Sequence, residues 1–201
     1  MPTREEITRH HSDGTPEGLD AWVPGKKPRV GIEVVEADPR WREDFALIAA
    51  RIRDALGAAA LEVEHVGSTS VPGLAAKPVI DIDLTVTDSA DEAAWLPKLE
   101  AVGFELVIRE PWWHEHRCLV GDVPRANLHV FPPDCAETIR HRLFRDWLRE
   151  HPDDVALYRD AKLAAARDAN AAGEHVMQYN ERKERVILAI YERAFRAAGL
   201  L

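Results

Sequence analysis

The sequence predicts a mixed α/β (α+β) domain that ends in a helical segment. Within residues 29–133, short β-branched runs of strand length alternate with stretches whose apolar residues recur at helical spacing. After Pro132-Pro133, helical spacing alone remains. A length of 201 residues with 46% apolar residues suits one globular domain with its own core. We therefore expect a mixed β-sheet core at 29–133 with flanking helices, followed by a helical tail at 134–201.

The elements follow from this spacing in chain order. Residues 1–28 are rich in Pro and Gly, which predicts a loosely ordered N-terminal extension; the alternative is a flap over a site, anchored by Trp22. The predicted helices are 40–56, 90–102, one through Ile139–Leu148, one starting near Pro152 and one from beyond Gly173 to Gly199. The predicted strands are Val30–Val35, Leu61–Val66, Val79–Val86, Phe104–Ile108, His116–Val120 and Asn127–Phe131, with a hairpin turn at Gly121-Asp122.

The charge of the chain is unevenly distributed. The net charge is −9, yet residues 136–201 hold 12 basic and 11 acidic side chains, while residues 1–135 hold 14 and 24. A negative protein is a poor candidate for strong non-specific nucleic-acid binding. If the acidic part binds a phosphate, it needs metal ions, helix termini or basic groups from the tail. The alternative is a solvated acidic surface.

Neither a membrane segment nor a disulfide framework is expected. No apolar run approaches the ~20 residues of a membrane span. The first residues, MPTREEITRHH, lack the apolar centre of a signal peptide. The two cysteines, Cys118 and Cys135, lie outside any CxxC pattern. These features predict a cytoplasmic protein without a membrane partner.

The densest chemical pattern is the segment 63–86, VEHVGSTSVPGLAAKPVIDIDLTV. Gly67 follows a predicted strand and permits a tight turn with close backbone approach. Three hydroxyl residues that suit capping and phosphate oxygens come next: Ser68, Thr69 and Ser70. If a short helix begins here, its free N–H groups favour an anion. Lys77 then precedes the following strand and can add positive charge.

Two acidic residues stand on that following strand. Asp81 and Asp83 are two residues apart, so both carboxylates share one face of the strand. Like charges this close repel, and a hard divalent cation such as Mg²⁺ (or Mn²⁺) relieves the repulsion. A lone D-x-D is also typical of a solvent-facing strand. A Gly-Ser turn upstream of it indicates phosphate and metal held side by side.

This segment resembles known proteins. Residues 65–84 resemble the signature of the nucleotidyltransferase superfamily, a Gly-Ser turn followed by Asp-x-Asp on the next strand. The string HVGSTSVPGLAAKPVIDI is more closely similar to the hallmark of the GrpB family, whose members can be fused to dephospho-coenzyme A kinase. Further matches are Trp41, Phe45, Leu128-His129-Val130, Phe144–Arg149, and the pairs Tyr158/Lys162 and Tyr179/Lys183. The resemblance covers roughly residues 30–197. It implies a nucleotidyltransferase-like fold and site, without a settled substrate.

One position departs from the enzyme superfamily. Active members usually place a third carboxylate on a later strand, and the central polar residue of that strand here is His129. A neutral imidazole can ligate a metal or act as a base, but it adds no negative charge. A one-metal site or a binding-only site therefore gains weight over a two-metal mechanism. A hydrogen-bonded strand histidine is the structural alternative.

Basic residues outside the motif complete the candidate site. Arg117 follows an aromatic run in 112–117, which is typical of a substrate-recognition loop. Lys162 and Lys183 each lie four residues after a tyrosine, on one helix face. They are expected to hold a triphosphate, or else to cover packed tyrosines with their apolar stems.

The function expected from these residues is metal-dependent transfer of a nucleotidyl group from a nucleoside triphosphate to an unknown small acceptor. The turn at Gly67–Ser68 would cradle phosphates, and Asp81 and Asp83 would hold Mg²⁺. The lysines would add positive charge, and His129 would be a ligand or base. The alternative is a non-catalytic nucleotide- or phosphate-binding module of the same fold. A third option is other phosphoryl chemistry at the same site.

Overall fold

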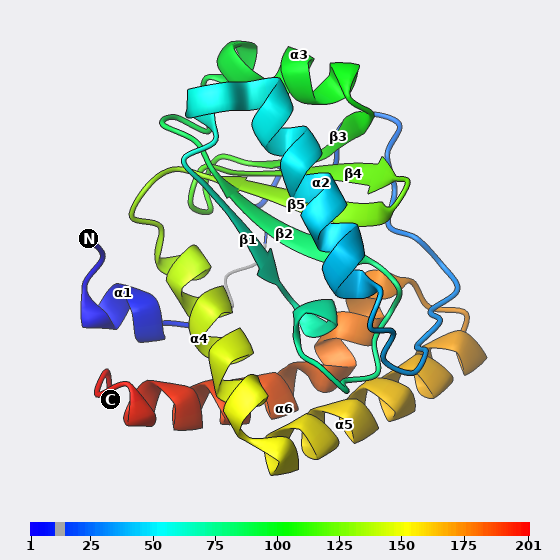
Figure 1. The fold of residues 1–201 in the computed structure, drawn as a ribbon. Coiled ribbons are helices and arrows are strands. Elements are labelled where there is room, and N and C mark those ends of the chain that lie inside the picture. Colours follow the sequence, from blue (N-terminus) through cyan, green and yellow to red (C-terminus); the bar gives the residue numbers. More distant parts are fainter. Residues whose placement is uncertain (11–14) are drawn as a thin grey trace.

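The computed structural model describes residues 1–10 and 15–201. At its centre lies a five-stranded mixed sheet in the order β1-β2-β5-β4-β3 (Figure 1). The strands are β1 (Glu62–Val66), β2 (Ile80–Thr85), β3 (Phe104–Glu110), β4 (His116–Asp122) and β5 (Arg125–Phe131). The β2–β5 pair is parallel, and the other neighbours are antiparallel.

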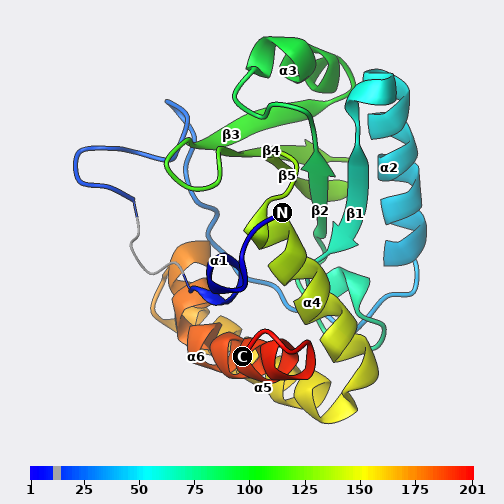
Figure 2. The same ribbon diagram turned by 90° about the vertical axis from the view of Figure 1, so that its left-hand side faces the viewer.

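Helices cover both faces of this sheet. One face carries α2 (Trp41–Leu56) and α3 (Glu92–Ala101), and the C-terminal helices lie against the other (Figures 1 and 2). These C-terminal helices are α4 (Ala136–Glu150), α5 (Pro152–Ala171) and α6 (Val176–Ala197). A short helix, α1 (Arg4–Thr8), packs against α4, and two 3-10 turns, η1 (Gly57–Ala59) and η2 (Ser68–Ser70), flank β1.

The main core explains why apolar and acidic residues alternate along β2. Ile80, Ile82 and Leu84 are buried in one cluster with α2 and α3, which contribute Ile48 and Trp95 among others. Because side chains alternate along a strand, the intervening aspartates lie on the opposite face, toward the C-terminal helices. The apolar face therefore fixes the direction in which the acidic side chains point.

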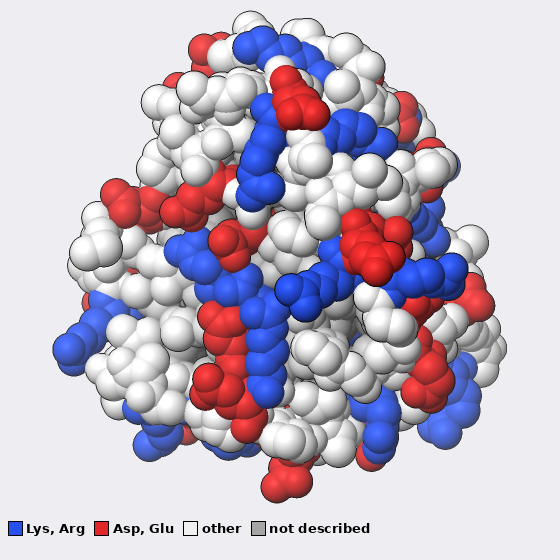
Figure 3. Space-filling model, in the orientation of Figure 1, with Lys and Arg blue, Asp and Glu red and all other residues white. Residues whose placement is uncertain are grey.

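The C-terminal helices dock through the loop that follows β1. Val71 and Leu74 of this loop pack with Leu148, Tyr158 and Ile190, one from each of α4, α5 and α6. Two ion pairs also join α4 to β1, Arg142 Nη1 to Glu62 Oε2 at 3.0 Å and Arg145 Nη1 to Glu64 Oε2 at 2.7 Å. Basic and acidic side chains lie side by side across the face seen in Figure 3.

The mixed α/β architecture with C-terminal helices is confirmed, but the strand predicted at Val30–Val35 is wrong. With the described residues, that segment makes isolated bridges and no strand pairing, from Val30 to His175 and from Val35 to Ala76. Gly31 has a φ of +76°, which turns the chain. The side-chain amide of Asn170 forms hydrogen bonds with both backbone groups of Ile32: Oδ1 accepts from Ile32 N at 2.9 Å, and Nδ2 donates to Ile32 O at 2.7 Å. These bonds replace those that a neighbouring strand would make.

The hairpin between β4 and β5 is present, but its turn lies two residues later than predicted. Gly121 and Asp122 belong to β4, where they pair with Ala126 and Arg125. The chain reverses at Val123-Pro124. Pro124 has no N–H to give to a ladder, so the turn is the position that suits it.

The N-terminal extension, residues 1–28, contacts the domain in two places, through helix α1 and along strand β3. Helix α1 begins with a capping box formed by Thr3 and Glu6. Farther along, Val23 N donates to Val107 O at 3.0 Å, and Arg109 N donates to Ala21 O at 2.8 Å, so this stretch runs along the outer edge of β3. The domain boundaries at residues 28 and 133 stay predictions.

None of the described helices combines the length and the apolar character that crossing a membrane requires.

The central core predicts a strong contrast between two leucines. Leu84 is fully buried in β2, whereas Leu47 on α2 is 62% exposed. We expect Leu84→Ala to lower the free energy of unfolding by about 2–5 kcal/mol through lost burial and a residual cavity. Leu47→Ala, the same chemical change, is expected to stay within about 0.5 kcal/mol. Urea denaturation measures both, and equal losses would mean that the packing of β2 has been misassigned.

Candidate functional site

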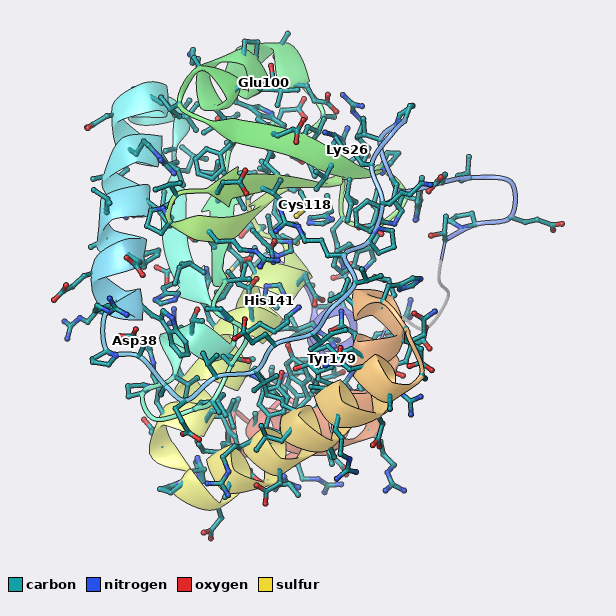
Figure 4. The ribbon with its side chains drawn as sticks, turned by 90° about the vertical axis from the view of Figure 1, so that its right-hand side faces the viewer. Lys26, Asp38, Glu100, Cys118, His141 and Tyr179 are labelled. Atoms are coloured by element: carbon teal, nitrogen blue, oxygen red, sulfur yellow. The ribbon has the colours of Figure 1, made fainter. Side chains whose placement is uncertain are left out.

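Polar side chains meet at the centre of the sheet face that lies toward the C-terminal helices. The parallel register of β2 and β5 sets Asp81 beside Asn127 and Asp83 beside His129. Asp83 is only 2% exposed, and Asp81 is half-buried. Figure 4 shows His141, discussed below, between the sheet and the C-terminal helices.

Asp81 lies directly against the Gly67 turn. Asn127 Nδ2 donates to Asp81 Oδ1 at 2.8 Å. A Cβ at Gly67 would stand 2.5 Å from Asp81 Oδ2, and Gly67 has a φ of +66°. Both the close approach and the left-handed backbone require glycine here. The turn and the carboxylate that the sequence placed together are thus in contact.

The three hydroxyl groups after Gly67 differ in availability. Thr69 Oγ1 lies 3.0 Å from His65 Nε2 and donates to Val79 O at 3.4 Å. Ser70 Oγ donates to Gly67 O at 2.6 Å. Within the described part of the chain, the half-buried Ser68 hydroxyl has no hydrogen-bond partner. Ser68 is therefore the hydroxyl that can reach a ligand, while the other two shape the turn.

Asp83 is paired with a residue that the sequence did not point to. His141 Nδ1 lies 2.8 Å from Asp83 Oδ2 and 3.1 Å from Oδ1, and His141 Nε2 lies 3.3 Å from Glu137 Oε1. Burial opposes the charged imidazole, but Asp83 and Glu137 outweigh it and raise the pKa of His141 well above its usual value. Burial likewise opposes the charged Glu137, yet His141 and then Arg140 lower its pKa to about 2.

His129 sits beside Asp83 but contacts a different partner. Its Nδ1 lies 3.0 Å from His116 Nε2, and His116 Nδ1 lies 2.7 Å from Glu110 Oε2. Burial, followed by the neighbouring His116, lowers the pKa of His129 to about 4. His129 is therefore a neutral, hydrogen-bonded strand histidine.

Three lysines gather around two tyrosine rings near Asp81. We call Lys77, Lys162 and Lys183 the lysine cluster. Lys162 Nζ lies 5.0 Å from the ring centre of Tyr158, and Lys183 Nζ lies 5.1 Å from that of Tyr179. Lys77 Nζ lies 5.4 Å from the same Tyr179 ring. The loop before β2, α5 and α6 thus each deliver one ammonium group to one place.

The lysine cluster has no ionic partner of its own within residues 1–10 and 15–201. Among the described residues, no carboxylate lies within ion-pair distance of these three ammonium groups. Lys162 is 2% exposed; burial and then the neighbouring Lys183 lower its pKa to about 6, while Asp81 opposes the shift. Burial also lowers the pKa of Lys77, again with Asp81 opposing. The field of Asp81 therefore reaches the cluster.

A buried hydroxyl marks the same place. The Tyr179 side chain is 1% exposed, and in the described chain its hydroxyl has no hydrogen-bond partner. Figure 4 shows Tyr179 in the layer next to α5 and α6.

The structure does not bring Arg117 to this site. Its side chain lies on the opposite face of the sheet, where Nε donates to Glu92 Oε1 of α3 at 2.7 Å. The preceding loop does approach the site face, because Trp113 packs against His116 and Phe131 with ring centres 5.1 Å and 6.0 Å away.

Asp81 and Asp83 are the residues that could hold a divalent ion. In the described chain, no three His, Cys, Asp or Glu side chains are grouped as metal ligands. Mg²⁺ is often bound by one or two carboxylates together with substrate phosphates and water. These two carboxylates are the donors that a single ion of that kind would use, and both oxygens of Asp83 already face His141.

Comparisons with known proteins identify relatives over most of the chain. Residues 31–193 match the family model described as GrpB protein. The chain is 47% identical over 169 residues to the UPF0157 protein BH1888 of Halalkalibacterium halodurans, covering 84% of this chain and 85% of that protein. A crystal structure of the conserved protein GrpB from Enterococcus faecalis has a TM-score of 0.71 and 32% identity, covering 83% of this chain and 99% of the other.

A longer protein also contains a similar stretch. Over an alignment 226 positions long, the chain is 31% identical to a dephospho-CoA kinase of Mycobacterium tuberculosis strain H37Rv. The match covers 92% of this chain but 55% of that protein.

The contact between the turn and Asp81 is tested by two glycines. Gly67 and Gly73 both have positive φ, but a Cβ at Gly73 would meet nothing within 4 Å. We expect Gly73→Ala to lower the free energy of unfolding by about 1–2 kcal/mol for the left-handed backbone alone. Gly67→Ala should lose roughly 1–3 kcal/mol more, because its methyl group collides with Asp81. Equal losses in chemical denaturation would contradict the contact.

The His141–Asp83 pair predicts a pH-dependent stability. Because the pKa of His141 is raised on folding, its contribution is full below about pH 6.5 and is lost as the pH rises through the folded value. At pH 6, His141→Gln is expected to lower the free energy of unfolding by about 3–5 kcal/mol. The difference from the wild type should shrink toward alkaline pH.

His65 provides a control with the opposite sign. Burial lowers its pKa to about 4, so the wild type loses stability relative to His65→Gln as the pH falls below about 6.5. Denaturation between pH 5 and pH 9 measures both curves. A flat difference for His141→Gln would remove the proposed charge on His141.

Proposed function

The chain belongs to the GrpB family, and from the geometry of its site we propose that it binds a nucleoside triphosphate and transfers a nucleotidyl group to a small acceptor. The observation that carries this proposal is the lysine cluster. Three lysine side chains without carboxylate partners among the described residues converge on the Tyr158 and Tyr179 rings, and the charge of Asp81, which lies against the Gly67 turn, acts on Lys77 and Lys162.

A polyphosphate is the ligand class that suits this cluster. Ammonium groups held together repel one another, and burial disfavours their charge further. A phosphate chain supplies several negative charges and many acceptor oxygens, so it relieves both effects. The unpartnered Ser68 hydroxyl adds a donor at the turn. In this proposal the β- and γ-phosphates lie between Ser68 and the lysine cluster.

Asp81 and Asp83 are the proposed holders of Mg²⁺ or Mn²⁺. When bound, such an ion would supply charge neutralisation at the phosphates. Asn127 and the Gly67 backbone keep Asp81 in place, and His141 does the same for Asp83. His129 would act as ligand or base only through Nε2, because its Nδ1 contacts His116.

The names of relatives agree with a nucleotide-related role at a coarse level. The match with a dephospho-CoA kinase covers about half of that protein, so its kinase activity does not transfer to this chain. What it supports is the pairing of a GrpB-like stretch with nucleotide chemistry.

The second candidate is a non-catalytic nucleotide- or phosphate-binding module. The observation that favours it is the occupied state of Asp83, whose two oxygens both face His141. The β5 residues beside the two aspartates are Asn127 and His129, so this strand adds no third carboxylate next to them. Such a module would bind the phosphates through the lysine cluster in the same way, but it would not convert the bound nucleotide.

Calorimetry and a pyrophosphate assay separate the candidates. Each nucleoside triphosphate is titrated with and without Mg²⁺, and pyrophosphate release is followed in the presence of a pool of small metabolites. Binding that Mg²⁺ tightens in the wild type but not in Asp81→Asn, together with pyrophosphate release, supports the transferase. Binding without release supports the module, and absence of any binding overturns both.

The lysine cluster predicts a specific loss of nucleotide affinity. The double variant Lys162→Met with Lys183→Met keeps the apolar stems and removes the charges. We expect it to weaken ATP binding by roughly 1–3 kcal/mol, the range of charge-assisted hydrogen bonds. Its thermal midpoint should not fall, because Lys162 is a buried amine whose charge is disfavoured by burial, and methionine replaces it with an apolar group.

Lys98→Met is the matched control for that measurement. Lys98 is exposed on α3, on the other face of the sheet, and we expect its replacement to leave ATP affinity unchanged. If both proteins bind ATP as the wild type does, the lysine cluster is not the phosphate site.

A further inference from the structure

A chain of contacts links the N-terminus of the protein to Asp83. We call residues 3–10 the N-terminal strap. Its helix α1 lies beside α4 and α6, away from the sheet (Figures 1 and 2). Ile7 of the strap is buried against Ala136, Tyr191 and Phe195. The strap is therefore docked on the C-terminal helices by its own apolar side chain.

Arg140 of α4 donates hydrogen bonds to the backbone of this strap. Its side chain is 5% exposed. Nη1 donates to Ile7 O at 3.3 Å and to Arg9 O, and Nη2 lies 3.0 Å from His10 Nδ1. The guanidinium also lies over the ring of Tyr191, 4.8 Å from its centre. A planar fork held by three acceptors has one orientation.

The opposite edge of the same guanidinium faces the site. Arg140 Nε lies 3.1 Å from Glu137 Oε2 as an ion pair, although Nε forms no hydrogen bond with any described residue, and the other oxygen of Glu137 lies 3.3 Å from His141 Nε2. His141 in turn holds both oxygens of Asp83 through Nδ1. Arg140, Glu137 and His141 therefore each contact one neighbour in this series with one side of the side chain and the next neighbour with the other side.

We infer that Arg140, held by the N-terminal strap, is a positioning residue for the His141–Asp83 pair. Without the strap, the guanidinium loses its acceptors from Ile7, Arg9 and His10 and has no fixed orientation. Glu137 then loses the fixed positive charge beside one of its oxygens while its other oxygen faces His141. The relevance to nucleotide rests on the proposed function, but the contacts themselves do not.

The inference enlarges the site beyond the family match. That match begins at residue 31, so the strap lies outside it. A segment outside the span of the family model thereby contributes to the placement of an acidic side chain at the centre of the sheet.

Nuclear magnetic resonance of the imidazole N–H groups tests the inference in the full-length protein. The His141 signals are assigned by their loss in His141→Gln. Ile7→Asp puts a charge into the apolar contact and undocks the strap, and Arg140→Lys keeps the charge but removes the fork. In both variants we expect the His141 N–H protons to exchange with water at least tenfold faster than in the wild type.

Arg9→Ala is the control, because this side chain is 59% exposed and its carbonyl is retained. Amide exchange of β2 reports whether each variant keeps its fold, and if Ile7→Asp does not, Arg140→Lys decides the outcome. Exchange within twofold of the wild type in the folded variants overturns the inference. ATP affinity is measured in parallel: if the wild type binds no ATP, the proposed function fails while the exchange result still stands.

Discussion

Two acidic side chains on the sheet face that the C-terminal helices cover are the constraint on which this structure depends. Asp81 and Asp83 point away from the apolar core and toward the helical layer, where water alone does not solvate them. Carboxylates in such a place need donors or cations. Each of the three C-terminal helices supplies one basic group, His141 from α4, Lys162 from α5 and Lys183 from α6. The docking of the tail is therefore electrostatic as well as apolar.

The two carboxylates have different surroundings. Asp83 is enclosed, and its charge is balanced at short range by His141. Asp81 is more open, lies against the Gly67 turn and feels the lysine cluster without an ion pair. One aspartate is thus committed to the structure, while the other faces the groups that have no partner among the described residues. The open side of the acidic pair is therefore the Asp81 side, where the lysine cluster lies.

Much of this arrangement could be predicted from the sequence because it is local. The period of two along β2 sets the aspartates opposite Ile82, and Gly67 marks a close backbone approach. His141 could not be found in this way, because its contact with Asp83 depends on how α4 docks; its only local signal is the four-residue spacing from Glu137. Arg117 was placed at the site from its neighbours, although it shares its strand face with the buried Leu119.

The order in which the chain is synthesised sets when the acidic pair is balanced. Asn127 on β5, the partner of Asp81, lies 46 residues later in the chain, and His141, the partner of Asp83, lies 58 residues later. The lysines of α5 and α6 follow later still. A chain that has formed β2 but has not yet docked β5 and α4 therefore has two acidic side chains without these partners. The acidic face of the sheet is covered only when α4–α6 pack against it, so the acidic pair gains its partners through contacts that are distant in sequence and form late in folding.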